Sequence, residues 1–218
     1  MLYKAIIFDL DGTLLNSLND LADSANAALK ALSLSPHPRK SYQYFVGDGV
    51  RTLIERIMPQ TSSEKQIREC EELYTSIYSA HWADQTCPYP GIATMLADLH
   101  AMGLGLAILS NKPDTFTRIC ADRFFQPGLY RCVRGQRVDT PRKPDPAGAL
   151  IIAGELGINP KDILYVGDTA TDMRTGRGAG MKTAGVLWGF RDQKELEASG
   201  ADFIVRAPQE IVDLCQNP

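Results

Sequence analysis

The stretch that decides the fold lies close to the N-terminus, where residues 6–17 read IIFDLDGTLLNS. An apolar run ends there at two carboxylates, Asp9 and Asp11, and Gly12 and Thr13 complete the turn that follows. Apolar residues ahead of a loop are ordinary core residues, but two like charges at the rim of a hydrophobic sheet repel each other. We therefore expect a buried strand whose end carries a functional site.

The bulk properties of the chain are those of an ordinary globular protein. It has 218 residues, 44% of them hydrophobic and 22% charged, which suits one large domain or a domain with a modest insertion. The formal net charge is −3 and no basic block is present, so no nucleic-acid partner is expected. No apolar run approaches the roughly 20 residues that cross a bilayer, so no membrane partner is expected either.

The cysteines and the N-terminus bear on the compartment. The five cysteines are scattered and form no C-x-x-C pair, so neither a zinc site nor a disulfide framework is indicated. Asp9 and Asp11 interrupt any signal-peptide core, and no small-residue cleavage site follows. Buried, reduced cysteines are typical of a reducing compartment. We predict a cytoplasmic location.

Six short apolar runs are candidate strands, at residues 4–10, 104–110, 130–135, 162–168, 183–189 and 202–207. The first four are far enough apart for helices to lie between them, and several are apolar on both faces. Strands of this kind suit a parallel sheet that is covered on both sides. The predicted fold class is therefore α/β, with a doubly wound, Rossmann-like parallel-sheet core.

The segment between the first two strands has helical periodicity instead. Apolar residues recur at helical spacing in three stretches, within residues 18–32, 50–57 and 67–78. Three amphipathic helices with no strand between them suit a small all-helical domain inserted in the core. We place this insertion at residues 16–82, which leaves residues 1–15 and 83–218 for the core. The proline-rich segment 86–91, TCPYPG, is the predicted return hinge.

Polar side chains follow four of the predicted strands. Ligand sites in parallel α/β sheets form at the carboxyl ends of the strands, so these side chains should meet at one rim. In chain order they are Asp9, Asp11, Thr13, Ser110, Asn111, Lys112, Lys143, Asp168 and Asp172. Four carboxylates, hydroxyl groups and lysine are thus predicted to converge on one rim.

This set of residues is typical of phosphoryl chemistry with a metal ion. Clustered carboxylates repel one another and their pKa values rise unless a cation is present. Oxygen ligands suit Mg²⁺, which often shares its coordination with a substrate phosphate. A carboxylate so placed can form an aspartyl-phosphate, which divides one difficult hydrolysis into two steps. Lys143 would stabilise the first aspartate and the charge on the transferring phosphoryl group.

Four motifs resemble, in the same order, those of the haloacid dehalogenase superfamily. They are DLDGT at residues 9–13, LSNK at 109–112, RKPDP at 142–146 and VGDTATD at 166–172. The match covers essentially the whole chain, and the helical insertion resembles the C1 cap of that superfamily. The resemblance implies a hydrolase in which the cap closes over the rim of the sheet.

The resemblance also implies roles for individual residues. Asp9 would be the nucleophile, and Asp11 would be the general acid for the leaving group and then the base for water. Mg²⁺ would be held by Asp9, the Asp11 carbonyl oxygen and Asp168, with Asp172 assisting through water or neighbouring contacts. The phosphate oxygens would be held by the side chain of Ser110 and by groups of Gly12, Thr13 and Asn111.

Within the superfamily, Asp11 favours phosphoryl over halide chemistry, because dehalogenase members lack the second aspartate. The SNKP sequence, the C1 cap and the stretch VGDGVRTLIERIM at residues 46–58 resemble the phosphoglycolate phosphatases most. The implied substrate is a small phosphorylated metabolite, with 2-phosphoglycolate as the best candidate. Arg51 could clamp its carboxylate, although a solvated helix capped by Asp48 explains the same residues.

Several alternatives stay open from the sequence. A β-phosphoglucomutase-like mutase or a pyrophosphatase would share the core, and a metabolite-binding regulatory protein would share the fold without the chemistry. The state of assembly is a monomer or a homodimer. Lys112 either lines the entrance or is simply exposed. Gly176 and Gly178 fall in a predicted helix, which either packs closely on the sheet or is looser than usual.

Overall fold

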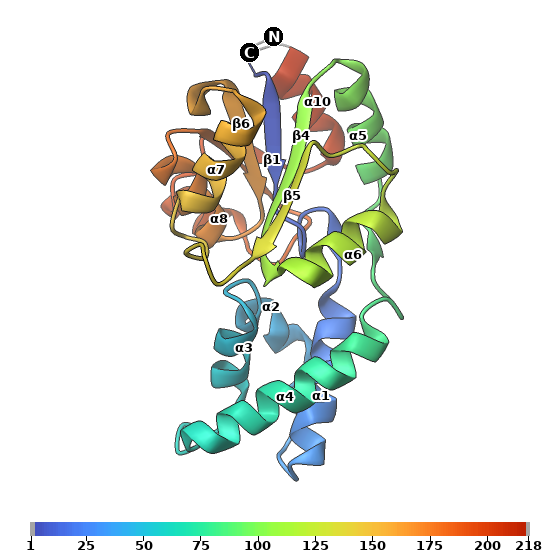
Figure 1. The fold of residues 1–218 in the computed structure, drawn as a ribbon, viewed down its shortest axis with the longest axis vertical. Coiled ribbons are helices and arrows are strands. Elements are labelled where there is room, and N and C mark those ends of the chain that lie inside the picture. The colour runs from blue at the N-terminus through green and yellow to red at the C-terminus, as the bar shows by residue number, and fades with distance from the viewer. Residues whose placement is uncertain (1–2, 217–218) are drawn as a thin grey trace. The chain divides into compact units, whose positions relative to one another are not determined.

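The structure, a computed structural model, describes residues 3–216 and divides the chain into two compact units (Figure 1). The first unit joins Met1–Leu15 to Pro88–Pro218, and the second is Asn16–Cys87. No helix within residues 3–216 is both long and apolar enough to cross a membrane. All five cysteines are free thiols.

The first unit is built on a six-stranded sheet in the order β5-β4-β1-β6-β7-β8, in which neighbouring strands are parallel. The strands are β1 Ala5–Phe8, β4 Gly105–Pro113, β5 Cys132–Gln136, β6 Ile163–Gly167, β7 Lys182–Val186 and β8 Phe203–Val205. All six predicted strands are present, and the doubly wound α/β prediction is confirmed. The chain runs outward in both directions from β1, which places β1 at the switch point where such sheets bind ligands.

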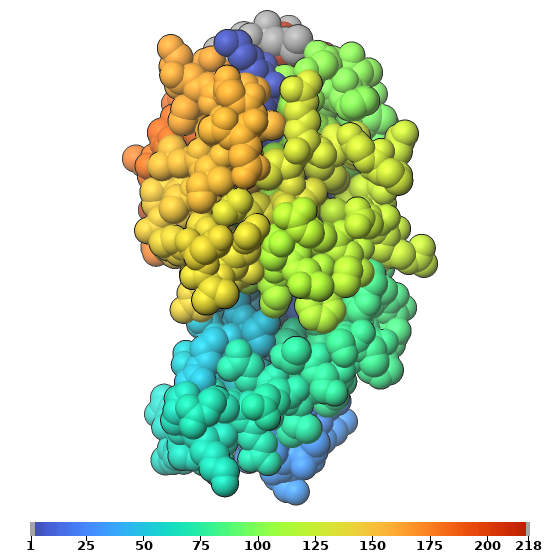
Figure 2. All heavy atoms as spheres, in the orientation of Figure 1, coloured from blue at the N-terminus to red at the C-terminus, as the bar shows by residue number. Residues whose placement is uncertain are grey.

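Six helices connect and cover these strands: α5 Ile92–Ala101, α6 Asp114–Phe124, α7 Ala147–Leu156, α8 Ala170–Gly178, α9 Gln193–Ala198 and α10 Pro208–Gln216. A 3₁₀ turn, η2 Pro160–Asp162, precedes β6. Helix α7 lies on one face of the sheet, whereas α5 and α10 lie together on the other (Figure 1). The central strand β1 is fully buried, and Figure 2 shows segments from later in the chain covering the sheet on the face in view.

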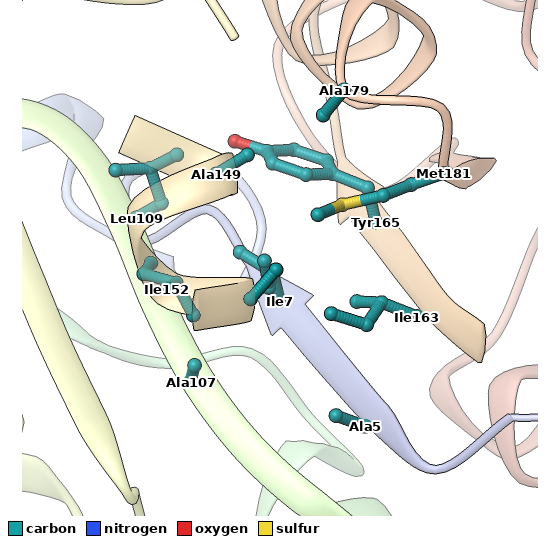
Figure 3. Packing of buried hydrophobic residues seen from close by; sticks show 11 residues of the cluster. Ala5, Ile7, Ala107, Leu109, Ala149, Ile152, Ile163, Tyr165, Ala179 and Met181 are labelled. Atoms are coloured by element: carbon teal, nitrogen blue, oxygen red, sulfur yellow. The ribbon is translucent and has the colours of Figure 1, made fainter. Parts of the chain in front are cut away.

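The core beneath α7 follows the alternation of side chains along the strands (Figure 3). Every second residue of the three central strands faces this helix. The cluster includes Ala5, Ile7, Ala107, Leu109, Ile163 and Tyr165 from the sheet and Ala149, Ile152 and Ala153 from α7. Ile6 and Phe8 on the other face of β1 are also fully buried, so the strand is apolar on both faces and polar residues begin only where it ends.

Gly176 shows that α8 packs closely on the sheet. A Cβ atom at this position would lie 2.5 Å from Thr183 Cγ2 and 2.8 Å from Tyr165 Cβ, well inside van der Waals contact. Only glycine lets the helix approach β6 and β7 this closely. Of the two interpretations that the sequence left open, the structure thus selects close packing.

The second unit is helical. It contains α1 Leu18–Ala31, η1 Arg39–Ser41, α2 Tyr42–Phe45, α3 Val50–Ile57 and α4 Glu64–His81. The three predicted helices are α1, α3 and α4. The sequence did not indicate η1 and α2, because a single turn is too short to show a helical period.

The two ends of the helical unit are tied to each other. Strand β2, Leu15–Asn16, pairs with β3, Cys87–Pro88. The buried carboxylate of Asp20 in α1 accepts hydrogen bonds from the Gln85 amide at 3.0 Å and from the Thr86 amide and hydroxyl at 2.8 and 2.7 Å. The unit therefore ends at Cys87 and not at residue 82, because these contacts hold the return segment to α1.

Candidate active site

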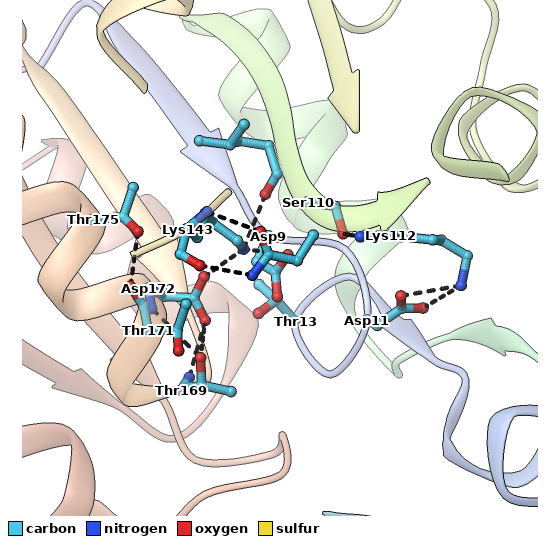
Figure 4. Close-up of polar contacts among 12 residues, drawn as sticks. Asp9, Asp11, Thr13, Ser110, Lys112, Lys143, Thr169, Thr171, Asp172 and Thr175 are labelled. Carbon is cyan, nitrogen blue, oxygen red and sulfur yellow. Dashed lines mark hydrogen bonds and ion pairs between the residues drawn. The ribbon is translucent and has the colours of Figure 1, made fainter. Parts of the chain in front are cut away.

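The carboxyl end of β1 leads directly into a cluster of charged residues, which are Asp9, Lys143, Asp168 and Asp172. Figure 4 shows Asp9, Lys143 and Asp172 in contact. Asp9 is the first residue beyond the strand, and its amide donates to Val166 O at 2.9 Å, so the pairing with β6 continues past Phe8. This pairing fixes the backbone of Asp9, and its side chain is only 9% exposed. The sheet itself therefore positions the predicted nucleophile.

Lys143 lies at the centre of the cluster. Its Nζ is 2.8 Å from Asp9 Oδ1, 2.7 Å from Asp172 Oδ1 and 3.2 Å from Leu109 O. Three acceptors match the three N–H donors of an ammonium group, so this buried cation is fully hydrogen-bonded. Two of the predicted carboxylates are thus joined through one lysine.

Asn111, at the end of β4, holds the backbone of Lys143 in place. Its Nδ2 donates to Lys143 O at 3.1 Å, and its Oδ1 accepts from the Lys143 amide at 2.9 Å. The side-chain amide of Asn111 thus forms the same two hydrogen bonds with Lys143 that a backbone amide group of a neighbouring strand would form. The side chain of Asn111 therefore supports Lys143, and the predicted phosphate contact of this residue would fall to its backbone.

Two of the acids, Asp168 and Asp172, come from the loop after β6 and the start of α8. Asp168 Oδ2 accepts from the Phe190 amide at 2.8 Å, and Asp168 Oδ1 accepts from Thr13 Oγ1 at 3.1 Å. Asp172 caps α8 in a reciprocal capping box with Thr169, whose hydroxyl donates to Asp172 Oδ2 at 2.6 Å. Asp172 is thus both part of the capping box of α8 and a partner of Lys143.

Three carboxylates in this cluster fit a divalent metal ion. Asp9, Asp168 and Asp172 each offer an oxygen, and these oxygens lie within 4.8 Å of one another. All are hard oxygen donors, as Mg²⁺ prefers. Gly12 has a φ of 88°, and a Cβ atom there would strike the Asp168 carboxylate, so glycine keeps this side of the cluster open. The donor set and the space both suit a cation.

The raised pKa values of the carboxylates in this cluster also favour a bound cation. Burial raises the pKa of Asp9 from 3.8 to about 7; Lys143 opposes this rise and Asp172 adds to it. Burial, together with Asp172 and Asp9, raises the pKa of Asp168 well above its ordinary value. Lys143 and, near Asp168, Arg191 do not offset these rises, and a divalent cation would supply further positive charge.

We expect the metal-free protein to lose stability as the pH rises from about 4 to about 7. The pKa of Asp9 is raised from 3.8 to about 7 in the folded state, so the folded chain binds this proton more tightly than the unfolded chain does. The contribution of this difference to the free energy of unfolding is lost as the pH rises and Asp9 deprotonates. A shift of this size corresponds to at most about 4 kcal/mol of unfolding free energy.

Urea unfolding at about pH 5 and about pH 8, in chelator and in saturating Mg²⁺, measures this dependence. In chelator the unfolding free energy should be lower at the higher pH, and Mg²⁺ should reduce the difference. A metal-free protein that becomes more stable between these two pH values would contradict the assignment.

Asp11 lies apart from this cluster. Its carboxylate points away from Asp9 and toward Lys112 at the end of β4 (Figure 4), and both of its oxygens are 3.1 Å from Lys112 Nζ. The side chain of Lys112 is only 4% exposed, so simple surface exposure does not explain this lysine. The hydroxyl of Ser110 accepts the Lys112 amide at 3.2 Å.

Arg51 belongs to the helical unit, where its guanidinium is already engaged. It donates to Glu64 Oε1 and Oε2 at 3.0 and 2.6 Å and to Glu55 Oε1 at 2.7 Å. The N-cap residue of helix α3 is Gly49 and not Asp48, which the alternative interpretation placed there. Asp48 instead accepts from Arg56 at 2.6 Å. The substrate-binding role of Arg51 stays a prediction.

The sequence did not reveal the part played by the segment after β7. The predicted strand at 183–189 ends at Val186, and the residues beyond it turn toward the site. Trp188 Nε1 donates to Thr13 O at 2.9 Å, and the Phe190 amide reaches Asp168. Gly189 allows this approach, because a Cβ atom there would strike Asp168 and Gly12 O. A glycine just past a strand end is the signal that could have indicated it.

Comparison with known proteins identifies the family. The model of the haloacid dehalogenase-like hydrolases matches residues 6–186, which include the four motifs and every residue of the cluster. The chain belongs to the haloacid dehalogenase-like hydrolase family. The resemblance drawn from the motifs is thereby confirmed, and the protein is an enzyme of the hydrolase class.

Individual members of the family resemble this hydrolase over nearly its whole length. A phosphoglycolate phosphatase of Aquifex aeolicus is 32% identical over 98% of this chain and 97% of its own. An N-acetylmuramic acid 6-phosphate phosphatase of Pseudomonas aeruginosa is 31% identical, over 98% and 95%. A crystal structure from Haemophilus somnus, described as a "predicted phosphoglycolate phosphatase", is 28% identical with a TM-score of 0.91 and covers 99% of both chains.

Proposed function

We propose that this haloacid dehalogenase-like hydrolase is a Mg²⁺-dependent phosphatase that cleaves a small phosphomonoester through an aspartyl-phosphate. The observation that supports the proposal most is the environment of Asp9, a buried carboxylate at the end of the central strand that shares Lys143 with Asp172. 2-Phosphoglycolate is the first candidate substrate, because relatives that match nearly the whole chain are named phosphoglycolate phosphatases.

In the first step an oxygen of Asp9 attacks phosphorus, and the bond between phosphorus and the alcohol oxygen breaks. Asp11 gives its proton to the departing oxygen, which leaves as the alcohol. In the second step Asp11 takes a proton from water, whose oxygen attacks the phosphorus and releases Asp9 and inorganic phosphate. Lys143 donates to Asp9 and stabilises the negative charge that the phosphoryl group carries through both steps.

The metal would be held by carboxylate oxygens of Asp9 and Asp168 and by the carbonyl oxygen of Asp11, with Asp172 in support. Bound Mg²⁺ supplies positive charge that offsets the repulsion between the Asp9 carboxylate and the phosphate dianion. The phosphate oxygens would be bound by the hydroxyl of Ser110 and by groups of Gly12, Thr13 and Asn111. The substrate would thus meet donors from the ends of both β1 and β4.

The helical unit Asn16–Cys87 is the proposed cap. It would close over the bound metabolite, exclude water while the aspartyl-phosphate forms, and reopen for product release. Arg51 is the proposed cap residue for a substrate carboxylate, and it would then exchange its contacts with Glu64 and Glu55 for the ligand. A cytoplasmic location and a monomeric or homodimeric state remain predictions.

A second candidate substrate is a sugar phosphate. The Pseudomonas aeruginosa relative named as acting on N-acetylmuramic acid 6-phosphate is about as similar to this chain as the phosphoglycolate phosphatases. The chemistry at Asp9 would be the same in either case, because only the alcohol differs. Residues that contact the alcohol would decide between the two substrates.

A panel of phosphate compounds tests this function. Phosphate release from 2-phosphoglycolate, N-acetylmuramic acid 6-phosphate, glucose 1-phosphate and pyrophosphate is measured with Mg²⁺ and with chelator, and Asp9→Asn protein serves as the control for contaminating phosphatases. We expect preferred release from 2-phosphoglycolate that chelator abolishes. Broad hydrolysis would withdraw this substrate and keep the chemistry. Conversion of glucose 1-phosphate to the 6-phosphate without phosphate release would favour a mutase, and binding without turnover would favour a regulatory protein.

A further inference from the structure

The end of β4 departs from regular strand geometry where it passes the site. Pairing with β5 is regular from Ala107 to Leu109 and resumes only at Pro113, so Ser110 to Lys112 lie in an irregular stretch. Irregularities of this kind commonly redirect a side chain next to an active site. Here the redirected side chain is that of Lys112.

The backbone of Lys112 is held from several sides. Its amide donates to Ser110 Oγ at 3.2 Å, and its carbonyl accepts from the buried hydroxyl of Thr117 in α6 at 3.1 Å. Gly135 of β5 packs against the same carbonyl, because a Cβ atom there would lie 2.7 Å from Lys112 O. The direction in which Lys112 leaves the strand is therefore fixed by a contact within β4 and by two neighbouring elements, α6 and β5.

The side chain of Lys112 ends on Asp11. Its Nζ lies 3.1 Å from both carboxylate oxygens, and the lysine side chain is 4% exposed, against 17% for Asp11. A lysine ammonium is rarely buried to this extent without a counter-charge, because its desolvation is costly. The pair joins the loop after β1 to the end of β4, 101 residues apart in the chain, so it depends on the fold and not on local sequence.

The location of this pair suits proton transfer to a leaving group. In phosphoryl transfer the attacking and leaving oxygens lie roughly in line on opposite sides of phosphorus. Asp9 is the more deeply buried acid and Asp11 the more exposed one, so a phosphate seated on Asp9 would turn its leaving oxygen outward. Lys112 holds the carboxylate of Asp11, the more exposed of the two acids, away from Asp9 (Figure 4).

We propose that Lys112 is a positioning residue for Asp11, which holds the Asp11 carboxylate where it can protonate the leaving alcohol. The inference rests on the proposed phosphatase function, and Lys112 acts through Asp11 without touching the phosphorus. Loss of Lys112 would leave Asp11 able to adopt other rotamers. Esters whose leaving group needs a proton would then be cleaved more slowly, whereas the cleavage rate of esters whose leaving group departs as a stable anion would not change.

The test compares two leaving groups in Lys112→Met protein. The rate of alcohol release in the first turnover is measured by rapid quench for 2-phosphoglycolate, or for the alkyl ester that the panel favours, and for p-nitrophenyl phosphate. First-turnover rates isolate the step in which Asp11 is the acid. We expect a loss of about 100-fold with the alkyl ester and less than about threefold with the aryl ester, because p-nitrophenolate leaves without protonation.

A double-mutant comparison supplies a second measurement. Asp11→Asn and Asp11→Asn/Lys112→Met proteins should release the alkyl alcohol at equal rates, because Lys112 has no function once the acid is gone. Lys182→Met removes a lysine that pairs with Asp202 on the surface and should leave both esters unaffected. Lys112→Gln replaces Lys112→Met if the methionine variant does not fold.

Equal losses with both esters, or a further loss in the double variant, would show that Lys112 acts only on the structure. No loss with either ester would show that Asp11 does not depend on Lys112. Both results would overturn the proposal. Failure of the proposed function looks different, because the wild-type protein itself would then release no alcohol from any ester.

Discussion

Asp9→Asn protein should release phosphate at least roughly 10⁴-fold more slowly than the wild type, while it folds normally. An asparagine amide is not a nucleophile toward phosphorus, and no other residue of the cluster occupies the end of the central strand. The isosteric amide also removes one of the buried carboxylates that repel each other. At about pH 8 in chelator, the variant should therefore be at least as stable as the wild type.

Initial rates on the preferred ester and urea unfolding curves measure the two effects. Asp162→Asn is the matched control, because Asp162 pairs with the exposed Lys4 far from the site, and this variant should keep wild-type activity. Substantial residual turnover in Asp9→Asn protein would remove Asp9 from the role of nucleophile. A loss of turnover that accompanies unfolding would leave only a structural role for this carboxylate.

Lys143→Met should lower both stability and turnover. The methionine side chain fills much of the same space but leaves Asp9 and Asp172 without their shared ammonium. Removing one partner of a buried ion pair costs about 3–5 kcal/mol, so this loss is expected at about pH 8 in chelator. The loss should be smaller at about pH 5, where Asp9, whose pKa is raised to about 7, is protonated and needs no counter-charge.

Unfolding free energies at both pH values, with and without Mg²⁺, test this prediction. Lys4→Met is the control, because Lys4 forms a comparable pair with Asp162 but is 68% exposed, and exposed pairs contribute less than about 1 kcal/mol. Equal losses at the two pH values would mean that Lys143 contributes packing and not charge. Phosphate release should fall in Lys143→Met protein even at a Mg²⁺ concentration that restores its stability.

The strands and the location of the site could be predicted because both depend on local sequence. Apolar runs such as residues 162–168 form buried strands wherever the sheet places them, and parallel strands all present their carboxyl ends at one edge. Asp9, Lys143 and Asp168 could therefore be brought together without knowing which strands are neighbours. The ends of elements were less predictable. Strand β7 ends at Val186, and the helical unit continues to Cys87, because Asp20 binds the return segment.

The sequence by itself determined the type of chemistry: acids and a lysine at the ends of parallel strands, in an order that matches a hydrolase family. Only the tertiary structure decided how these residues contact one another. Asn111 holds the backbone of Lys143, which is 32 residues away in the chain, and Lys112 pairs with Asp11, which is 101 residues away. Such contacts depend on strand order, on the irregularity in β4 and on the close packing that Gly135 allows. A local pattern cannot specify them, because each arises from the distance between segments that only the folded sheet sets.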